Sequence, residues 1–569
     1  MVNKNNDKKT KGDSTTRSNR RFDRILSGIY GSAFSTRYKR IPRTHSFSEL
    51  ESIPNSDTKG STTDTRRITV AAIELKKDVI TKATGEDGLN RKINYSRQLS
   101  YSTNFLPIAK EVQTNIIYNW SGIHEIAREA QIVRPTTVNQ LIRIVRTATS
   151  KLTLMGTGLS YEKLMTAQLD DPDAKLISMQ HFNGLIEMKK ETAIFGAATS
   201  VNDVIAILAS YNRMLPCSPG VIGIQTLGGA IATGTHGQGM RQSSYSDIVQ
   251  SLKVVLPNGK VVTVDENTDE YPLQAFVTAM GTLAITLQVE ITHIPRRIFS
   301  CNKFTCKIDI LLSDYVKWNE ENEFVKVWWF PETDFCHVWF INEANEKQRE
   351  QFLATPGDAL LEAKYVRRSI NETIDEYLKS MALDTKIAEE SSRPQFETLR
   401  RFTNAKDVIG YLEQIVCKGI PVPQINCEIA IPIEHIHEAT LALKSWADKN
   451  KKRLHYPFIY RAVGQSKAWL SPAYKGGVCF VGFLVYVAED GTVRDDSMRT
   501  MGELQTILGQ FGGIPHWGKH FDPNIYNFEH LIPKWNDFLD LRARLDPNRK
   551  MLSTFLENIY KLSDNFNSI

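Results

Sequence analysis

The most distinctive stretch of the chain is Ser218-Pro-Gly-Val-Ile-Gly-Ile-Gln-Thr-Leu-Gly-Gly-Ala-Ile-Ala-Thr-Gly-Thr-His-Gly-Gln-Gly239. It holds seven glycines in 22 residues, with small side chains and one histidine between them. A core strand or an ordinary helix would not tolerate so much glycine, because glycine weakens both. The composition instead predicts a backbone laid against an extended ligand, with small side chains that permit a close approach.

A shorter glycine motif precedes this stretch, at Met155-Gly-Thr-Gly-Leu-Ser160. Residues 151–155 predict a strand before it, and glycines at a strand end let backbone N–H groups approach phosphate oxygens. Neither Gly-x-Gly-x-x-Gly nor Gly-x-x-x-x-Gly-Lys-Ser/Thr occurs in the chain. A nicotinamide-binding fold of the Rossmann type and a P-loop nucleotidase are therefore not indicated.

Hydrophobic periodicity predicts alternating helices and strands on both sides of these loops. Val138, Leu141, Ile142 and Val145 form the apolar face of a helix that begins after Pro135. Further elements of the first half are predicted at 193–197 (strand), 202–211 (helix), 251–256, 261–264 and 283–294 (strands). The second half is predicted to hold strands at 325–330, 336–341, 426–431 and 478–487 and helices at 408–416 and 436–449. This pattern predicts an α/β or α+β protein with a separate antiparallel sheet in its second half, and we expect the α+β class.

The net charge of +6 is concentrated at the N-terminus. Residues 1–43 hold 12 of the 70 Lys and Arg residues but three of the 64 Asp and Glu residues, which leaves 58 basic and 61 acidic residues elsewhere. A near-neutral body argues against a nucleic-acid-binding core. Residues 1–115 are predicted to be a basic, largely disordered extension. Residues 20–43 are open to four interpretations: a solvated tail, a mitochondrial transit peptide, a contact arm for an unknown acidic partner, or a secretion signal.

Hydropathy and cysteine usage bear on location. The longest apolar run, residues 479–488, is about ten residues and too short to span a bilayer, and no secretory signal is recognisable. The seven cysteines include no Cys-x-x-Cys pair. These features predict a soluble protein of a reducing compartment without a metal site or integral membrane association. We expect a cytoplasmic location, with mitochondrial targeting by the N-terminal tail as the alternative.

Six short motifs, in this order along the chain, resemble those of the FAD-linked oxidoreductases of the vanillyl-alcohol oxidase superfamily. They are Gly156-Thr-Gly-Leu-Ser160, Leu227-Gly-Gly-Ala-Ile-Ala-Thr-Gly-Thr-His-Gly237, Gly281-Thr-Leu-Ala-Ile-Thr286, Trp469-Leu-Ser-Pro-Ala-Tyr474, Pro515-His-Trp-Gly-Lys519 and Asp546-Pro-Asn548. The resemblance spans about 118–560 and is closest to the sugar-lactone and alditol oxidase branch, which includes the D-arabinono-1,4-lactone oxidases.

The resemblance implies a PCMH-type FAD-binding domain of two α/β subdomains at 116–297. It also implies an antiparallel-sheet cap domain for the substrate at 298–500 and a C-terminal segment at 501–569 that returns to the flavin. The residues expected at the cofactor are Gly156, Thr157, Gly158, Leu159, Ser160, Gly220, Gly228, Gly229, Thr233, Gly234, His236, Gly237, Ile285, His516 and Lys519.

One position predicts how the flavin is held. Covalent members of the family attach it to a histidine after the Gly-x-Gly, and this chain has Leu159 there. Leucine has no nucleophilic atom, so we expect FAD to bind without a covalent bond. His236 is the alternative attachment point, although we interpret it as a polar partner of the cofactor or of its own loop.

Gly220 falls where the family's oxidases have glycine and its plant dehydrogenases have alanine. Without a methyl group at this position, a path for oxygen to the flavin stays open, and we therefore expect O2 as the electron acceptor. The competing interpretation is a simple turn glycine after Pro219.

Three residues are implied to act on the substrate. Lys519 is expected at the pyrimidine side of the flavin, where a cation stabilises developing negative charge. Arg461 falls in the family's Glu-x-Arg pattern, and its planar guanidinium suits bidentate contacts. The glutamate of that pattern is replaced by Ile459. Without this carboxylate, the usual lactone substrate is in doubt and no residue can be named as the general base. Glu428 keeps another family acid and orients the arginine or the substrate, unless it is a surface residue of a strand.

The implied activity is oxidation of a CH–OH group of a sugar-derived donor, of the aldonolactone or alditol type, with hydride transfer to the flavin. Oxygen would then be reduced to hydrogen peroxide. One alternative is a dehydrogenase of the same fold that uses a quinone or a cytochrome. Another is a flavin-binding protein whose cap domain has been repurposed for partner binding.

Acid precipitation of the purified protein tests the mode of flavin binding. Because Leu159 cannot form a bond to the ring, we expect a yellow protein whose colour passes entirely into the supernatant. A pellet that stays yellow contradicts non-covalent binding, and a colourless protein contradicts the flavin itself.

Overall fold

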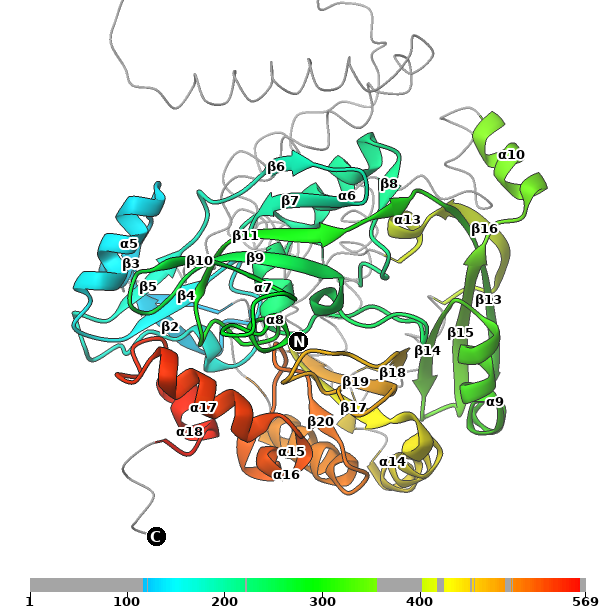
Figure 1. Ribbon diagram of the computed structural model, residues 1–569. Coiled ribbons are helices and arrows are strands. Elements are labelled where there is room, and N and C mark those ends of the chain that lie inside the picture. The colour runs from blue at the N-terminus through cyan, green and yellow to red at the C-terminus, as the bar shows by residue number, and fades with distance from the viewer. Residues whose placement is uncertain are drawn as a thin grey trace, which may run out of the picture.

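The computed structural model describes residues 116–119, 121–220, 223–355, 402–416, 424–450, 453–454, 456–486, 493 and 495–562. The predicted N-terminal extension, 1–115, lies outside the described residues. The described elements form two groups of sheets, which lie to the upper left and the lower right of Figure 1, with the C-terminal helices along its lower edge.

The first group begins with a short hairpin and a small parallel sheet. The hairpin consists of β1 (Ile116–Tyr118) and β2 (Glu125–Arg128). The parallel sheet has the order β3-β5-β4 and consists of β3 (Ile132–Val133), β5 (Lys175–Ser178) and β4 (Leu152–Met155). Helix α5 (Val138–Thr147) begins at Thr137, whose side chain accepts a hydrogen bond from the backbone N–H of Gln140. Its buried residues Leu141 and Val145 pack against this sheet, as the periodicity predicted.

An antiparallel sheet of five strands completes this group, in the order β10-β9-β11-β7-β6. The strands are β6 (Leu185–Met188), β7 (Thr192–Gly196), β9 (Val249–Val255), β10 (Val261–Asp265) and β11 (Ile285–Thr292). The helices of this part are α6 (Val201–Ser210), α7 (Leu227–Ala232) and α8 (Leu273–Phe276). A two-stranded pair, β8 (Arg213–Met214) and β12 (Ile294–Pro295), leads on to the second group.

The second group is one sheet of eight strands, in the order β16-β13-β15-β14-β18-β19-β17-β20. Its strands are β13 (Ile298–Lys307), β14 (Phe324–Phe330), β15 (Phe335–Glu343), β16 (Ala405–Tyr411), β17 (Gln424–Pro432), β18 (Phe458–Val463), β19 (Val478–Tyr486) and β20 (Ile514–Pro515). The helices in this part are α9 (Ile308–Glu321), α10 (Glu346–Ala354), α13 (Leu412–Val416), α14 (Ile436–Asn450) and α15 (Asp495–Gly509). All of its strand pairs are antiparallel.

Side-chain alternation gives this sheet two different faces. On β17, Ile425, Cys427 and Ile429 belong to the main hydrophobic core, while the side chains between them line the cavity described below. Helices α9, α14 and α15 pack against strands of this sheet, on the face whose side chains belong to the main hydrophobic core. The helix-covered face therefore stabilises the sheet, and the opposite face is available for a ligand.

The chain ends in short helices that return to the first group of sheets. They are α16 (Phe528–Leu531), α17 (Trp535–Leu545) and α18 (Thr554–Ile559), and Figure 1 shows α17 and α18 below β2 and β4. The backbone N–H of Leu152 on β4 donates to the carbonyl of Lys550 at 2.7 Å, which fixes this return. Short 3₁₀ turns complete the structure at Glu129–Gln131, Lys163–Met165, Tyr245–Ile248, Ile433–His435 and Pro523–Ile525.

Two sequence predictions about local structure were wrong. Residues 408–416, predicted as a helix, form the end of β16 followed by the short helix α13. The strand prevails because β16 pairs with β13 at the edge of the sheet, a long-range contact that local periodicity does not report. The glycine stretch also contains a helix, since Leu227–Ala232 form α7 despite Gly228 and Gly229. The side chain of Thr226 caps that helix by accepting from the N–H of Gly229.

Two leucines of α14 provide a matched test of the core. Leu443 is fully buried and Leu441 is 42% exposed on the same helix. Leu443→Ala should lower the free energy of unfolding by about 2–5 kcal/mol because it leaves a cavity, whereas Leu441→Ala should change it by no more than about 0.5 kcal/mol. Urea denaturation of both variants measures this, and equal losses would contradict the orientation of the helix.

Candidate active site

One cavity of about 860 Å³ lies between the two groups of sheets. The first glycine loop, Gly156–Ser160, lines it together with Gly228 and Gly229 of α7. From the eight-stranded sheet, Glu428, Arg461 and the alternating side chains of β14 and β15 contribute to its wall. The cavity therefore joins the glycine loops to the uncovered face of the second sheet, within the range of volumes that ligand sites occupy.

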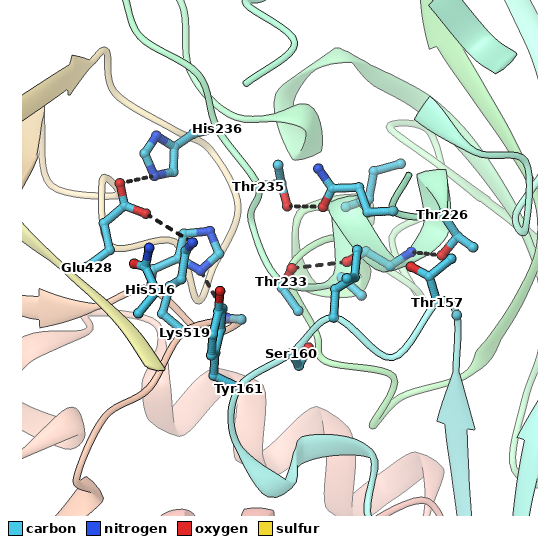
Figure 2. Close-up of a pocket in the computed structure, with 18 of the residues that line it drawn as sticks. Thr157, Ser160, Tyr161, Thr226, Thr233, Thr235, His236, Glu428, His516 and Lys519 are labelled. Carbon is cyan, nitrogen blue, oxygen red and sulfur yellow. Dashed lines mark hydrogen bonds and ion pairs between the residues drawn. The ribbon is translucent and has the colours of Figure 1, made fainter. Parts of the chain in front are cut away.

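The two glycine loops approach each other closely. A Cβ at Gly156 would lie 2.3 Å from Oγ1 of Thr226, and a Cβ at Gly228 would lie 3.0 Å from the carbonyl oxygen of Ala197. Glycine is therefore required where the first loop meets α7 and where α7 meets the end of β7. Figure 2 shows Thr157, Thr226 and Thr233 on this side of the cavity, with Thr157 and Thr226 beside each other.

Most of the expected cofactor residues line this cavity. They are Gly156, Thr157, Gly158, Leu159, Ser160, Gly228, Gly229, Thr233, His236, Ile285, His516 and Lys519. Gly220, Gly234 and Gly237 are not among the lining residues. The three expected catalytic residues, Glu428, Arg461 and Lys519, also line the cavity, although their roles stay predictions.

Gly220, Gly234 and Gly237, which do not line the cavity, are glycines because of their backbone conformation or the lack of space for a Cβ. Gly220 has φ +70°, and a Cβ there would lie 3.0 Å from the carbonyl oxygen of His236. Gly234 has φ +67°, and a Cβ at Gly237 would lie 2.4 Å from the side chain of Ser218. The turn interpretation of Gly220 thus has a direct structural basis, because its backbone lies in the left-handed region.

A buried carboxylate occupies the end of the cavity opposite the threonines. Glu428 is 2% exposed and accepts two hydrogen bonds from Arg461, one of them from Nε at 3.1 Å. Nζ of Lys519 lies 3.9 Å from its second oxygen, and Nε2 of His236 lies 3.7 Å from the first. The surface interpretation of Glu428 was therefore wrong, because its side chain lies in the cavity wall beside Arg461, His236 and Lys519.

The charges of this cluster determine its protonation. Burial alone would raise the pKa of Glu428, but the nearby charges of Arg461 and Lys519 hold that pKa well below its usual range. Burial lowers the pKa of Lys519, and the charge of Glu428 opposes that effect. The pair of Glu428 and Arg461 is therefore ionised near neutral pH.

Two histidines beside the carboxylate are neutral. Burial lowers the pKa of His516 to about 4 and that of His236 well below its ordinary value. Nδ1 of His516 accepts from the N–H of Gly518 at 2.9 Å, so that its Nε2 carries the proton. Nδ1 of His236 contacts the carbonyl of Gly237 at 3.0 Å, which places its proton on Nδ1. The ring of His236 stacks on Phe480 at 3.6 Å between centroids.

The segment that carries Lys519 is fixed by its own backbone and by Trp517. The N–H of His516 donates to the carbonyl of Glu428 at 2.9 Å. Trp517 is fully buried, and its indole N–H donates to the carbonyl of Leu470 at 2.8 Å. In Figure 2, His516, Lys519 and Glu428 lie together across the cavity from Thr233 and Thr226. The short Pro-His-Trp-Gly-Lys motif therefore places a lysine and a histidine at the buried carboxylate.

Sequence reasoning missed several lining residues. They include Tyr161, Thr226, Lys326, Trp328, His337, Trp339 and Asn426. One signal was present in the sequence, since Lys326 is a lysine within the otherwise apolar strand Phe324–Phe330 and is 5% exposed. Thr226 gave a weaker signal, as a threonine directly before the predicted glycine loop. The others could not be assigned to the cavity without the strand register.

The chemistry of the cavity wall fits FAD. Threonine and serine hydroxyls and glycine backbone at one end suit a diphosphate, because small donors permit close approach of its oxygens. The cationic Lys519 and the N–H-bearing His516 at the other end suit the polar edge of a flavin ring. No group of three or more His, Cys, Asp or Glu side chains in the described part of the chain could hold a metal ion. Across the same residues, no helix is long and apolar enough to cross a membrane.

Comparison with known proteins agrees with this geometry. The family model of an FAD binding domain matches residues 130–265, and that of D-arabinono-1,4-lactone oxidase matches residues 289–559. The L-gulonolactone oxidase of Mus musculus is 23% identical over 454 residues, which cover 78% of this chain and 97% of that protein. The L-gulono-1,4-lactone dehydrogenase of Mycobacterium tuberculosis is 23% identical over 451 residues, which cover 78% of this chain and 98% of that protein.

A solved structure supports the same fold. The crystal structure of cholesterol oxidase from B. sterolicum has a TM-score of 0.62 and 16% identity, and the match covers 79% of this chain and 96% of that one. At this identity the likeness concerns the fold alone. Together with the two family models, it confirms the α+β fold with a PCMH-type FAD-binding part. The chain is an FAD-dependent oxidoreductase acting on CH–OH donors, and the two family models and the relatives support its place among the sugar-lactone oxidases of the vanillyl-alcohol oxidase superfamily.

Proposed function

We propose that this protein oxidises a CH–OH group of a sugar-derived donor, of the aldonolactone or alditol type, and passes the electrons to O2. The observation that carries the proposal is the cluster of Glu428, Arg461 and Lys519 at one end of a cavity whose other end is formed by glycine loops. When bound, FAD supplies the redox chemistry by accepting a hydride from the donor carbon.

We propose that the cation of Arg461 contacts the substrate and that the cation of Lys519 contacts the flavin. Arg461 is held by Glu428 through two hydrogen bonds, so its planar guanidinium is oriented before a ligand arrives. Its remaining N–H groups are suited to donor hydroxyls or a lactone carbonyl. Lys519 is suited to stabilising negative charge that develops during the reaction. Glu428 is thus a positioning residue for both cations.

We propose that the FAD is bound without a covalent bond. Leu159 lines the cavity and offers no atom that could bond to a flavin. His236 is engaged through Nδ1 with Gly237 and stacks on Phe480, which supports a role as a polar partner of its own loop.

The proposed division of the chain follows the sheets. Residues 116–297 would form the FAD-binding part, 298–500 the substrate part and 501–569 the returning segment. In support, the eight-stranded sheet begins with β13 at Ile298, and β20 and Lys519 come from the last segment. We further propose a soluble enzyme of a reducing compartment, in line with the six described cysteines, which form no disulfide.

Oxygen is the proposed acceptor, and a dehydrogenase is the competing candidate. The relatives support both, since a mouse oxidase and a mycobacterial dehydrogenase are each 23% identical to this chain. Gly220 favours the oxidase by resemblance, although its positive φ is a separate reason for glycine at this turn.

Anaerobic reduction followed by exposure to air tests the function. Mixing the holoprotein with aldonolactones, alditols and aldoses should bleach the flavin absorbance with at least one donor. Air should then restore the absorbance, with one hydrogen peroxide released per donor. Bleaching without reoxidation by oxygen, but with reoxidation by a quinone or cytochrome c, would indicate the dehydrogenase. No bleaching with any donor contradicts the proposal.

Lys519→Met should retain flavin but slow its reduction by about 10²–10³-fold, because a preorganised cation is lost from the site. Stopped-flow absorbance under anaerobic conditions measures this rate. Lys534→Met is the control, since Lys534 pairs with Asp537 outside the cavity lining and should reduce at the wild-type rate. Equal rates of flavin reduction in the wild type and both variants would show that Lys519 does not contribute to the reaction.

The buried neutral His516 predicts a loss of stability in acid. Its folded pKa of about 4 lies below its ordinary value of 6.5, so the unfolded chain binds the proton first and stability falls as pH falls between these values. Between pH 7.5 and pH 5, we expect a loss of roughly 2 kcal/mol from this group. Urea denaturation should show that His516→Gln loses less unfolding free energy than the wild type over this pH range. His530→Gln, a substitution of an exposed histidine, should lose as much as the wild type. An identical pH slope in all three would refute the assignment.

A further inference from the structure

Two cysteines lie directly opposite each other on neighbouring strands of the eight-stranded sheet. Cys306 of β13 pairs with Cys336 of β15 in an antiparallel register without irregularity. Neither forms a disulfide. The proposed reaction uses neither side chain, and neither lines the cavity.

The hydrogen bonds at the two ends of this strand pair determine the geometry at the cysteines. The N–H of Ile308 donates to the carbonyl of Asp334 at 2.9 Å, and the N–H of Ala344 donates to the carbonyl of Ile298 at 2.9 Å. In an antiparallel pair, hydrogen-bonded positions recur at every second residue, so Cys306 and Cys336 occupy such a position. Their Cα atoms are then about 5.5 Å apart, within the range that a disulfide spans.

The two thiols are unequally accessible. Cys306 is half-buried near the end of β13, just before α9 begins, whereas Cys336 is fully buried in the main core. A small oxidant in solution therefore meets Cys306 first. The second thiol is protected from solvent but adjacent to the first.

Their chemistry is also unequal. The neighbouring thiol of Cys336 lowers the pKa of Cys306 below its ordinary value. Burial is the main cause that raises the pKa of Cys336. The accessible sulfur is thus the better nucleophile of the pair, because the thiolate is the form that reacts.

We propose that Cys306 and Cys336 form a peroxide-oxidisable dithiol, a modification site that closes to a cross-strand disulfide. The Cys306 thiolate attacks one oxygen of hydrogen peroxide and breaks the O–O bond, which gives a sulfenic acid and, with one proton, water. The Cys336 thiol then attacks that sulfur, and the sulfenic hydroxyl leaves as a second water. Two thiols are oxidised and one peroxide is reduced.

The disulfide would fasten the two ends of the segment that contains α9 and β14. Lys326 and Trp328 of β14 line the cavity, and so does His337, which follows Cys336 on the opposite face of the sheet. The modification would therefore act on the wall of the substrate cavity rather than on the glycine loops.

The source of peroxide is the one point at which this inference rests on the proposed function. An oxidase would generate hydrogen peroxide within its own cavity, next to the sheet that carries the dithiol. Peroxide added to the holoenzyme tests the dithiol without that assumption.

The first experiment treats the reduced holoenzyme with hydrogen peroxide and then blocks the remaining thiols with an alkylating agent. Mass spectrometry should show a loss of about 2 Da and a linked pair of peptides that contain Cys306 and Cys336, both reversed by dithiothreitol. Stable sulfinic acid at Cys306 without the linked pair would overturn the proposal. So would two alkylated thiols at a peroxide concentration that oxidises free cysteine.

Two variants complete the test. Cys306→Ser should abolish the disulfide and leave Cys336 alkylated after unfolding. Cys301→Ser is the matched control on the same strand, because Cys301 pairs with Ile341 and Val408 rather than with a cysteine. The linked peptides should form in this control as in the wild type, and their absence would count against a specific pair.

A second arm separates this inference from the proposed function. Turnover with a donor in air should form the same linked peptides without added peroxide, and catalase should prevent it. If added peroxide forms the disulfide but turnover releases no peroxide, the dithiol stands and the proposed use of oxygen fails. If turnover releases peroxide and the thiols persist both during turnover and after added peroxide, the oxidase stands and the dithiol fails.

Discussion

The burial of one carboxylate constrains much of this structure. Glu428 lies on the inner face of β17 and is almost inaccessible to water. An uncompensated charge at such a position is destabilising by several kcal/mol, so its oxygens need cationic partners. Arg461 from β18 and Lys519 from the returning segment provide them. The same requirement brings three separate parts of the chain together at one end of the cavity.

The eight-stranded sheet makes this arrangement possible because it has two unlike faces. Its core face carries residues such as Ile429, Phe458 and Trp329, which pack in the main hydrophobic core. Its other face presents Glu428, Arg461 and Trp328 to the cavity. Successive side chains of a strand point to opposite faces of the sheet. One set of residues therefore stabilises the core, and the set between them faces the ligand cavity. Substitutions on one face can therefore change the ligand site with little cost to the core.

The glycine loops form the opposite end of the cavity, and close packing rather than charge pairing determines their arrangement. There, close approach replaces charge: Gly156 lies against Thr226, and Gly228 lies against the end of β7. Small residues permit a tight crossing of two loops and leave hydroxyls and backbone N–H groups for a diphosphate. The cavity thus has a neutral, donor-rich end and an end where charges are paired, which matches the two unlike halves of a flavin dinucleotide.

The sequence by itself determined the local features of this protein. Its glycine-rich stretch and the motif at Pro515–Lys519 sufficed to indicate FAD and its branch of enzymes, because such patterns depend on residues close in the chain. Strong periodicity also predicted α5 and strands such as β7, β14 and β17 correctly, although it missed β13 and β18. Only the tertiary structure decided which distant residues meet. It placed 408–411, the first part of a predicted helix, in an edge strand, buried Glu428 against Arg461 and Lys519, and set Cys306 opposite Cys336. Strand register and burial arise from long-range pairing, and local sequence patterns do not encode that pairing.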